Sequence, residues 1–213
     1  MMNTAHPTPP QLKAPILPVV VVNSVTHALR IAEGLIEGGI EQIEITLRTP
    51  CALDAIAAVK QHFPELLLSA GTVLTPKQFD QAHAAGASFC ISPGLTNTLA
   101  EYALHQQLMW IPGFATASEM LLAIEMNFTT LKFFPAMTNG GPAALAALAS
   151  TVTNVQFIPT GGIELNDLAH WKKIPSVIAC GGTWLSKNLD DNSALTKQIA
   201  IRAKTTLDAW SQA

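Results

Sequence analysis

The chain has 213 residues, a net charge of -3 and a sequence pI near 6.0, which excludes the basic stripe that binding to a nucleic-acid backbone requires. Only 13% of its residues are charged, compared with roughly 25% in an average soluble domain. We therefore expect part of the surface to be covered by a partner subunit.

The cysteines and the N-terminal region favour a cytoplasmic protein. The three cysteines are odd in number and lack metal-binding spacing, which predicts reduced thiols. Residues 1–15 lack the regions of a signal peptide, and the longest apolar run, residues 14–22, is about half as long as a membrane span. The cysteines are Cys51, Cys90 and Cys180.

After a proline-rich arm over residues 1–13, a short apolar run followed by a helical segment recurs eight times. Residues 14–213 are therefore predicted to form one domain. The predicted strands are 16–22, 42–48, 66–73, 89–93, 108–114, 131–136, 155–162 and 176–182. The predicted helices are 24–39, 50–63, 75–86, 95–106, 116–126, 140–150, 163–172 and 192–210.

Local signals mark several helix ends. Ser24 and Thr75 suit N-cap positions, and Thr116 with Glu119 has the spacing of a capping box. Gly38, Gly39 and Gly86 stand where helices are expected to end.

The alternation of strands and helices predicts parallel strands with helical crossovers. Eight repeats fit an α/β (β/α)8 TIM barrel. An open doubly wound sheet is the alternative, but its first turn is usually rich in glycine. The segment "VVVNSVTHA" at the first predicted turn contains no glycine, which favours the barrel.

Only three charged residues, Glu44, Arg48 and Lys132, fall within the predicted strands. Side chains alternate between the two faces of a strand, so these three are expected to face the barrel interior. A purely structural ion-pair cluster would account for them. A poorly hydrated lysine also suits Schiff-base chemistry on a carbonyl, and a carboxylate such as Glu44 would move protons between its steps.

Glycine and threonine follow three of the predicted strands, and the last two groups occupy the usual phosphate position of such barrels. These groups are Gly71-Thr72, Thr160-Gly161-Gly162 and Gly181-Gly182-Thr183. The six histidines lie in the arm or on predicted helices without metal-ligand spacing, which disfavours a metal centre. Pro93 and Pro112 are expected to end their strands.

The motifs "EITLRT", "SAGTV", "ISPGLT", "KFFPA", "PTGGI" and "GGTW" occur in matching order over about residues 16–187. The sequence thereby resembles the 2-keto-3-deoxy-6-phosphogluconate (KDPG) and 4-hydroxy-2-oxoglutarate (KHG) aldolases. The resemblance implies a cytoplasmic, homotrimeric TIM-barrel lyase of the Entner–Doudoroff pathway, without metal or cofactor. It implies cleavage of KDPG to pyruvate and glyceraldehyde 3-phosphate, and of KHG to pyruvate and glyoxylate.

The resemblance also implies roles for particular residues. Lys132 would form the Schiff base and Glu44 would transfer protons. The remaining residues would bind substrate: Arg48, Thr72 and Pro93 on the pyruvate side, Phe134 beside the iminium, Thr160 at the hydroxyl groups, and Gly161, Gly162, Gly182 and Thr183 at the phosphate.

Two departures from the family pattern leave substrate preference open. Thr183 stands where serine is frequent, and Met137-Thr138 stand where a charged residue is common. The alternatives are a related aldolase that prefers the galactonate epimer, one that prefers unphosphorylated KHG, and a non-catalytic phosphosugar-binding barrel.

Overall fold

The computed structural model describes residues 11–212, so most of the predicted N-terminal arm lies outside the described residues. The strands are β1 (Ile16–Val20), β2 (Gln42–Thr46), β3 (Leu67–Gly71), β4 (Phe89–Ile91), β5 (Trp110–Ile111), β6 (Gly113–Phe114), β7 (Thr130–Phe133), β8 (Gln156–Pro159) and β9 (Cys180–Gly182). The helices are α1 (Val25–Glu37), α2 (Ala52–His62), α3 (Pro76–Ala84), α4 (Asn97–His105), α5 (Ala117–Glu125), α6 (Gly141–Ala149), the 3-10 helix η1 (Leu165–Asp167), α7 (Leu168–Lys172) and α8 (Leu195–Gln212).

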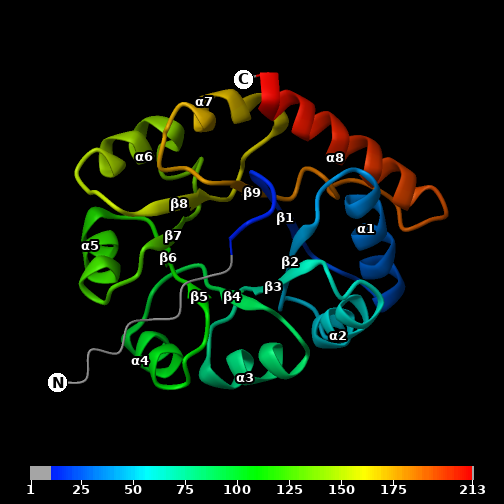
Figure 1. The fold of residues 1–213 in the computed structure, drawn as a ribbon, viewed down its shortest axis with the longest axis horizontal. Coiled ribbons are helices and arrows are strands. Elements are labelled where there is room, and N and C mark those ends of the chain that lie inside the picture. The colour runs from blue at the N-terminus through cyan, green and yellow to red at the C-terminus, as the bar shows by residue number, and fades with distance from the viewer. Residues whose placement is uncertain (1–10, 213) are drawn as a thin grey trace.

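The strands form two sheets in which every pairing is parallel, as predicted for an α/β fold. A six-stranded sheet has the order β5-β4-β3-β2-β1-β9, and a three-stranded sheet has the order β6-β7-β8. Figure 1 shows the strands in the middle of the molecule and the helices around the outside. Helices α1 and α8, from opposite ends of the chain, lie side by side in this outer layer.

Most predicted strands are shorter in the structure, and two predictions were wrong in more than their ends. Pro112 does not end a strand over residues 108–114 but separates β5 from β6. It cannot donate to the ladder, yet its carbonyl still accepts a hydrogen bond from the Lys132 amide at 2.9 Å. The predicted strand 176–182 is shortened to β9, because residues before it pair with β8 only through an isolated bridge from Val177 to Phe157.

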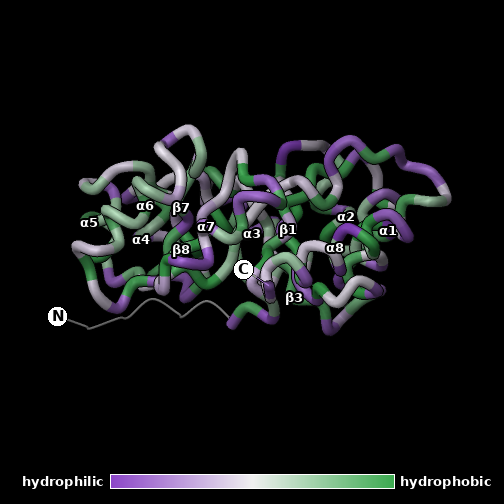
Figure 2. The backbone as a smooth tube through the Cα atoms, turned by 90° about the horizontal axis from the view of Figure 1, so that it is seen from above, coloured by the Kyte–Doolittle hydropathy of each residue, from purple (hydrophilic) through white to green (hydrophobic). Residues whose placement is uncertain are grey.

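The apolar residues form two cores. The larger contains side chains from both strands and helices, and it lies between these layers. The smaller draws residues from both sheets and none from a helix, so the sheets enclose apolar side chains of their own: Leu17, Phe89, Ile91, Ile111, Ile158 and Ala179. Figure 2 shows many hydrophobic positions in the interior of the molecule and many hydrophilic positions in its outer segments.

The predicted helix signals are confirmed. The side chains of Ser24 and Thr75 accept hydrogen bonds from amides in the first turns of α1 and α3. Thr116 and Glu119 form the capping box of α5, and Gly38 is the C-cap of α1. No helix within residues 11–212 is long and apolar enough to cross a membrane.

Candidate active site

Lys132 on β7 points to the interior face of its sheet, as its position in the sequence predicted. Its neighbours Leu131 and Phe133 belong to the larger core that includes the helices. Lys132 itself is in register with Ile158 of the smaller interior core. Only 6% of the residue is exposed, so the ammonium group is held largely away from water.

Glu44 on β2 provides the charge that faces this lysine. The Lys132 Nζ atom lies 3.0 Å from Glu44 Oε1 and 3.4 Å from Oε2. The side chains are 7% and 1% exposed, respectively. A buried charge is tolerated when it is paired and hydrogen-bonded, and each of these residues supplies the partner that the other needs. The pair thus places an amine and a carboxylate in direct contact.

Phe134 connects the lysine to the first glycine turn. The Lys132 Nζ atom lies 5.5 Å from the centroid of the Phe134 ring. The same ring packs against Gly161, where an added Cβ atom would stand 3.2 Å from it. Gly161 and Gly162 have φ angles of 106° and 76°, a region that glycine adopts without strain. Glycine therefore allows the backbone to turn beside the aromatic ring.

The second glycine turn adjoins the first. Thr160 and Gly181 form an isolated parallel bridge, and a Cβ atom at Gly181 would collide with the Thr160 side chain. The indole ring of Trp184 occupies the space where Gly182 would carry a Cβ atom. Thr183, between these two residues, is exposed. The first turn follows the carboxyl end of β8, as Phe134 follows β7, whereas Gly181 and Gly182 are the last residues of β9 and only Thr183 follows that strand.

The family model for KDPG and KHG aldolases matches residues 11–199. The chain belongs to this aldolase family. A relative named KHG/KDPG aldolase, from Escherichia coli (strain K12), is 44% identical over 171 residues, which cover 80% of each chain. The motifs that suggested the resemblance are therefore part of a similarity that extends along most of the sequence.

Solved structures of this aldolase family share the fold. A 2-keto-3-deoxy-6-phosphogluconate aldolase from Zymomonas mobilis is 39% identical, with a TM-score of 0.86 over 91% of this chain and 92% of that one. The KDPG aldolase from Legionella pneumophila is 36% identical, with a TM-score of 0.85 over 91% and 94%. That structure holds pyruvate captured as a covalent carbinolamine intermediate.

Arg48 differs from its prediction. It was expected within a strand, facing the interior with Glu44 and Lys132. Strand β2 ends at Thr46, and Arg48 is an exposed residue of the turn that leads to α2. The reason is that the chain leaves the sheet two residues earlier than its apolar alternation suggested, which keeps the guanidinium hydrated. Of the three charged residues expected in the interior of this aldolase, only Glu44 and Lys132 are found there.

Thr72 and Pro93 follow β3 and β4 and are both half-buried. Thr72 has a φ angle of 60°, which is uncommon for a β-branched residue. The backbone carbonyl of Pro93 packs against Gly113, which is in register with Lys132. These contacts place Pro93 at the strand end across β6 from the lysine.

Five of the six histidines lie within residues 11–212, and all five are on helices, as predicted. Within the same residues, no group of three or more His, Cys, Asp or Glu side chains is arranged to hold a metal ion. The thiols of Cys51, Cys90 and Cys180 are free.

Gly71 is a site residue whose role the sequence did not reveal. A Cβ atom at this position would collide with the carboxylate of Glu44. Gly71 was predicted only as a residue at a strand end, although glycine inside a strand often marks a close approach by another group. That signal was present, but it could not identify the group that approaches.

Proposed function

We propose that this chain is a class I aldolase that cleaves KDPG to pyruvate and glyceraldehyde 3-phosphate through a Schiff base on Lys132. The observation that carries the proposal is the buried contact between the Lys132 amine and the Glu44 carboxylate. A structural ion pair needs no such position beside Phe134, whose ring packs against the turn at Gly161. The carbinolamine captured in the similar Legionella pneumophila aldolase supports covalent chemistry of this kind.

The proposed reaction begins when the Lys132 amine, after giving a proton to Glu44, attacks the C2 ketone of the substrate. Glu44 then gives its proton to the hydroxyl group of the carbinolamine, which leaves as water, so that an iminium ion forms and Glu44 is a carboxylate again. Glu44, again as a carboxylate, then removes the proton from the C4 hydroxyl group. The C3–C4 bond breaks, the aldehyde leaves, and the electron pair passes into the iminium to form an enamine. Glu44 returns the proton to C3, and water releases pyruvate.

The remaining site residues would bind the two ends of the substrate. Arg48, exposed at the end of β2, would reach the keto-acid carboxylate together with Thr72 and Pro93. Phe134 would pack against the iminium, since its ring lies beside the lysine. Thr160 would contact the hydroxyl groups.

The phosphate would lie between Gly161, Gly162, Gly182 and Thr183. Backbone amides of glycine-rich turns at strand ends form such anion sites in α/β barrels. Because KHG lacks the phosphate, it would react by the same chemistry at Lys132 and Glu44 and would bind less tightly. The similar Escherichia coli protein bears the name of both activities.

We also infer that the two sheets close into a single (β/α)8 barrel. Only Pro112 separates β5 from β6, and the bridge from Thr160 to Gly181 joins β8 to β9. The interior core with residues from both sheets supports closure. The helices would then form the outer ring, and the Lys132–Glu44 pair would lie inside the barrel.

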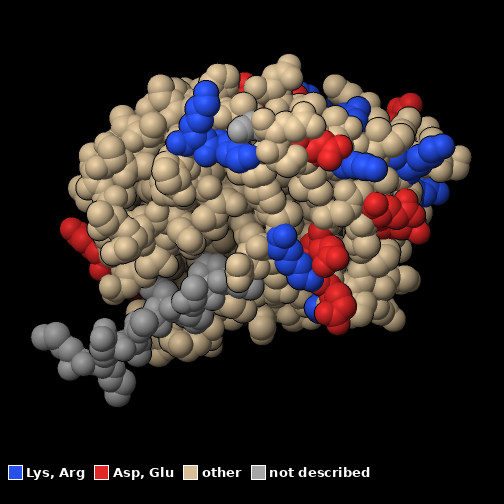
Figure 3. Space-filling view, turned by 45° about the horizontal axis from the view of Figure 1, so that its top comes forward, with Lys and Arg blue, Asp and Glu red and all other residues tan. Residues whose placement is uncertain are grey.

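A homotrimer is the proposed assembly. Figure 3 shows a face on which large areas carry neither acidic nor basic side chains. Leu121 and Leu122 on α5 are 53% and 38% exposed, and exposed apolar side chains of this size favour a subunit contact. Light scattering on the purified protein would measure the mass, and any mass other than that of three chains would contradict the proposal.

The catalytic proposal is tested by trapping the Schiff base. Incubation with pyruvate and borohydride should add a reduced pyruvyl group to Lys132, as located by peptide mass spectrometry. The Lys132→Ala variant should gain no mass and release no pyruvate. Pyruvate release from KDPG, its galactonate epimer and KHG would then rank the substrates. Tight ligand binding without trapping or turnover would instead support a non-catalytic barrel.

A further inference from the structure

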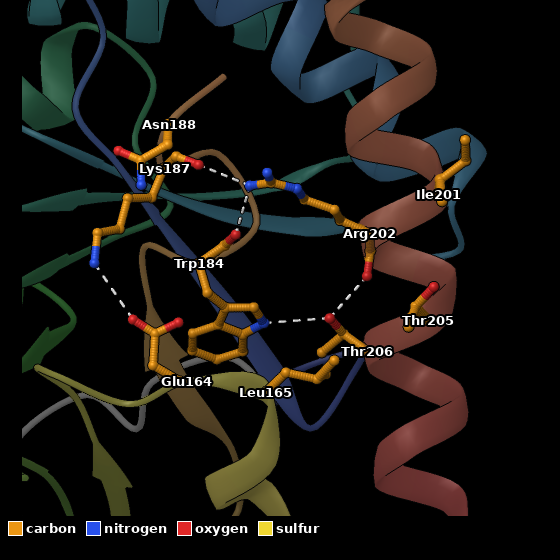
Figure 4. A pocket seen from close by; sticks show the side chains of 9 residues that line it. All are labelled: Glu164, Leu165, Trp184, Lys187, Asn188, Ile201, Arg202, Thr205 and Thr206. Atoms are coloured by element: carbon orange, nitrogen blue, oxygen red, sulfur yellow. Dashed lines mark hydrogen bonds and ion pairs between the residues drawn. The ribbon is translucent and has the colours of Figure 1, made fainter.

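Helix α8 holds the turn that follows β9. Arg202 on this helix donates hydrogen bonds from Nη1 to the backbone carbonyls of Trp184, at 2.9 Å, and of Lys187, at 2.8 Å. Hydrogen bonds from a charged donor are stronger than those between neutral groups. Figure 4 shows the guanidinium reaching from α8 to both carbonyls. The helix thus binds the main chain of the turn at two points.

A second contact from α8 fixes the side chain at the start of the turn. The Trp184 Nε1 group donates to Thr206 Oγ1 at 3.2 Å, and Thr206 in turn donates to the Arg202 carbonyl at 2.7 Å. Carbon atoms of the six-membered ring of the same indole lie against Gly182. Movement of Trp184 would therefore be transmitted directly to the backbone at Gly182.

The turn itself is a compact unit. The amides of Ser186 and Lys187 both donate to the carbonyl of Thr183, at 3.0 and 2.8 Å. Lys187 therefore links Thr183 to α8: its amide donates to the Thr183 carbonyl, and its own carbonyl accepts the hydrogen bond from Arg202. An exposed ion pair between Lys187 and Glu164, 3.3 Å apart, joins the turn to the segment after Gly162, although an exposed pair of this kind adds little stability.

We propose that Arg202 is a positioning residue for the phosphate group of the substrate. It touches neither the substrate nor the reacting atoms, and acts by holding Gly182 and Thr183 in the conformation that binds the phosphate. This role rests on the proposed function, in which these two residues form part of the phosphate site. Lys132 and Glu44 come from β7 and β2, so loss of Arg202 should leave the chemical steps intact.

The consequence is a substrate-dependent effect. A displaced turn weakens binding of a phosphorylated substrate and leaves an unphosphorylated one unaffected. A merely structural role for Arg202 would lower the activity with both substrates to the same extent. Comparison of KDPG with KHG therefore separates positioning from general stability.

The test compares Arg202→Met with Arg202→Lys. Thr205→Ala is the matched control, because Thr205 is an exposed residue of α8 that lines a surface pocket together with Arg202 and Trp184. For Arg202→Met, KM for KDPG should rise by roughly tenfold, since small displacements of binding groups have effects of this size or larger. Its kcat with KDPG, and both constants with KHG, should stay within about twofold of the parent values. Arg202→Lys should recover part of the loss because an ammonium group retains donors for the carbonyls.

Each outcome decides a separate question. Equal losses with KDPG and KHG, or an unchanged KM for KDPG, would overturn the role of Arg202 while the aldolase function stands. If the parent protein binds KDPG no better than KHG, the proposed phosphate site is wrong, and the proposed role of Arg202 is wrong with it. If Arg202→Met does not fold, Arg202→Lys decides the question through the ratio of its KM for KDPG to its KM for KHG. A ratio equal to that of the parent would overturn the proposal.

Discussion

The carboxylate of Glu44 occupies the space beside the Cα atom of Gly71, where any other residue would carry its side chain. A Cβ atom at Gly71 would collide with Glu44 Oε1 and crowd the carbon atoms behind it. Glu44 is 1% exposed and is bonded to Lys132, so a shift of the carboxylate away from Gly71 would disturb that contact. The absence of a side chain at position 71 therefore contributes to the geometry of the pair.

Gly71→Ala should lower kcat by about tenfold or more, because the carboxylate must move away from the lysine. Overpacking of this kind also costs about 1–3 kcal/mol of stability. Gly94→Ala is the control, since nothing lies within 4 Å of a Cβ atom at that position. Steady-state pyruvate release and urea denaturation of both variants check the expectation. A fully active Gly71→Ala variant would show that Glu44 does not need its present position.

Removal of one member of the buried pair should destabilise the fold and also abolish the activity. Lys132→Met leaves the Glu44 charge buried without a partner, which costs about 3–5 kcal/mol in comparable pairs. The double variant Glu44→Gln, Lys132→Met removes both charges and should regain much of that stability while it stays inactive. Urea unfolding of the parent, the single variant and the double variant measures the difference. A single variant as stable as the parent would mean that water reaches the pair freely.

The capping box of α5 should make stability depend on acid pH. Glu119 accepts hydrogen bonds from the amides of Ala115 and Thr116 at 2.8 and 2.9 Å, and the bond from Ala115 is the main cause that lowers its pKa below 4.5. A carboxyl group with a lowered pKa in the folded state stabilises the protein above its unfolded pKa and loses that contribution as the pH falls through the folded value.

The measurement compares the parent with Glu119→Gln. The stability advantage of the parent should be complete near pH 7 and should shrink as the pH falls below 4.5, the value of the unfolded group. Thr116→Ala should cost about 1 kcal/mol through loss of the N-cap and should not affect turnover. A difference between parent and Glu119→Gln that is independent of pH would contradict the role of the carboxylate.

The three thiols should differ in reactivity. Burial raises the pKa of Cys90 to about 12 and raises that of Cys180 further above its usual value, and only the thiolate reacts. Cys51 is half-buried, with Sγ 3.5 Å from Thr49 Oγ1. Ellman's reagent at pH 8 should therefore titrate about one thiol in the native protein and none in Cys51→Ser. Rapid reaction of two or more thiols in the native state would contradict the burial of Cys90 and Cys180.

The sequence determined the elements and the direction of the lysine. Apolar alternation with helical segments between the runs predicted parallel strands, because parallel neighbours need long crossovers. The flanking residues Leu131 and Phe133 predicted the interior orientation of Lys132, since side chains alternate along a strand. The caps at Ser24, Thr75 and Thr116 were likewise local properties, decided by residues within one turn of each other.

Only the tertiary structure decided which groups meet. Glu44 and Lys132 are 88 positions apart, and alternation assigns each to a face without fixing the distance across the interior. Arg48 fitted the same pattern but lies outside the strand, because the turn after Thr46 begins before the pattern ends. The contacts of Gly71 with Glu44 and of Arg202 with the turn after β9 depend on strand register and helix packing, which bring together residues that no local pattern connects.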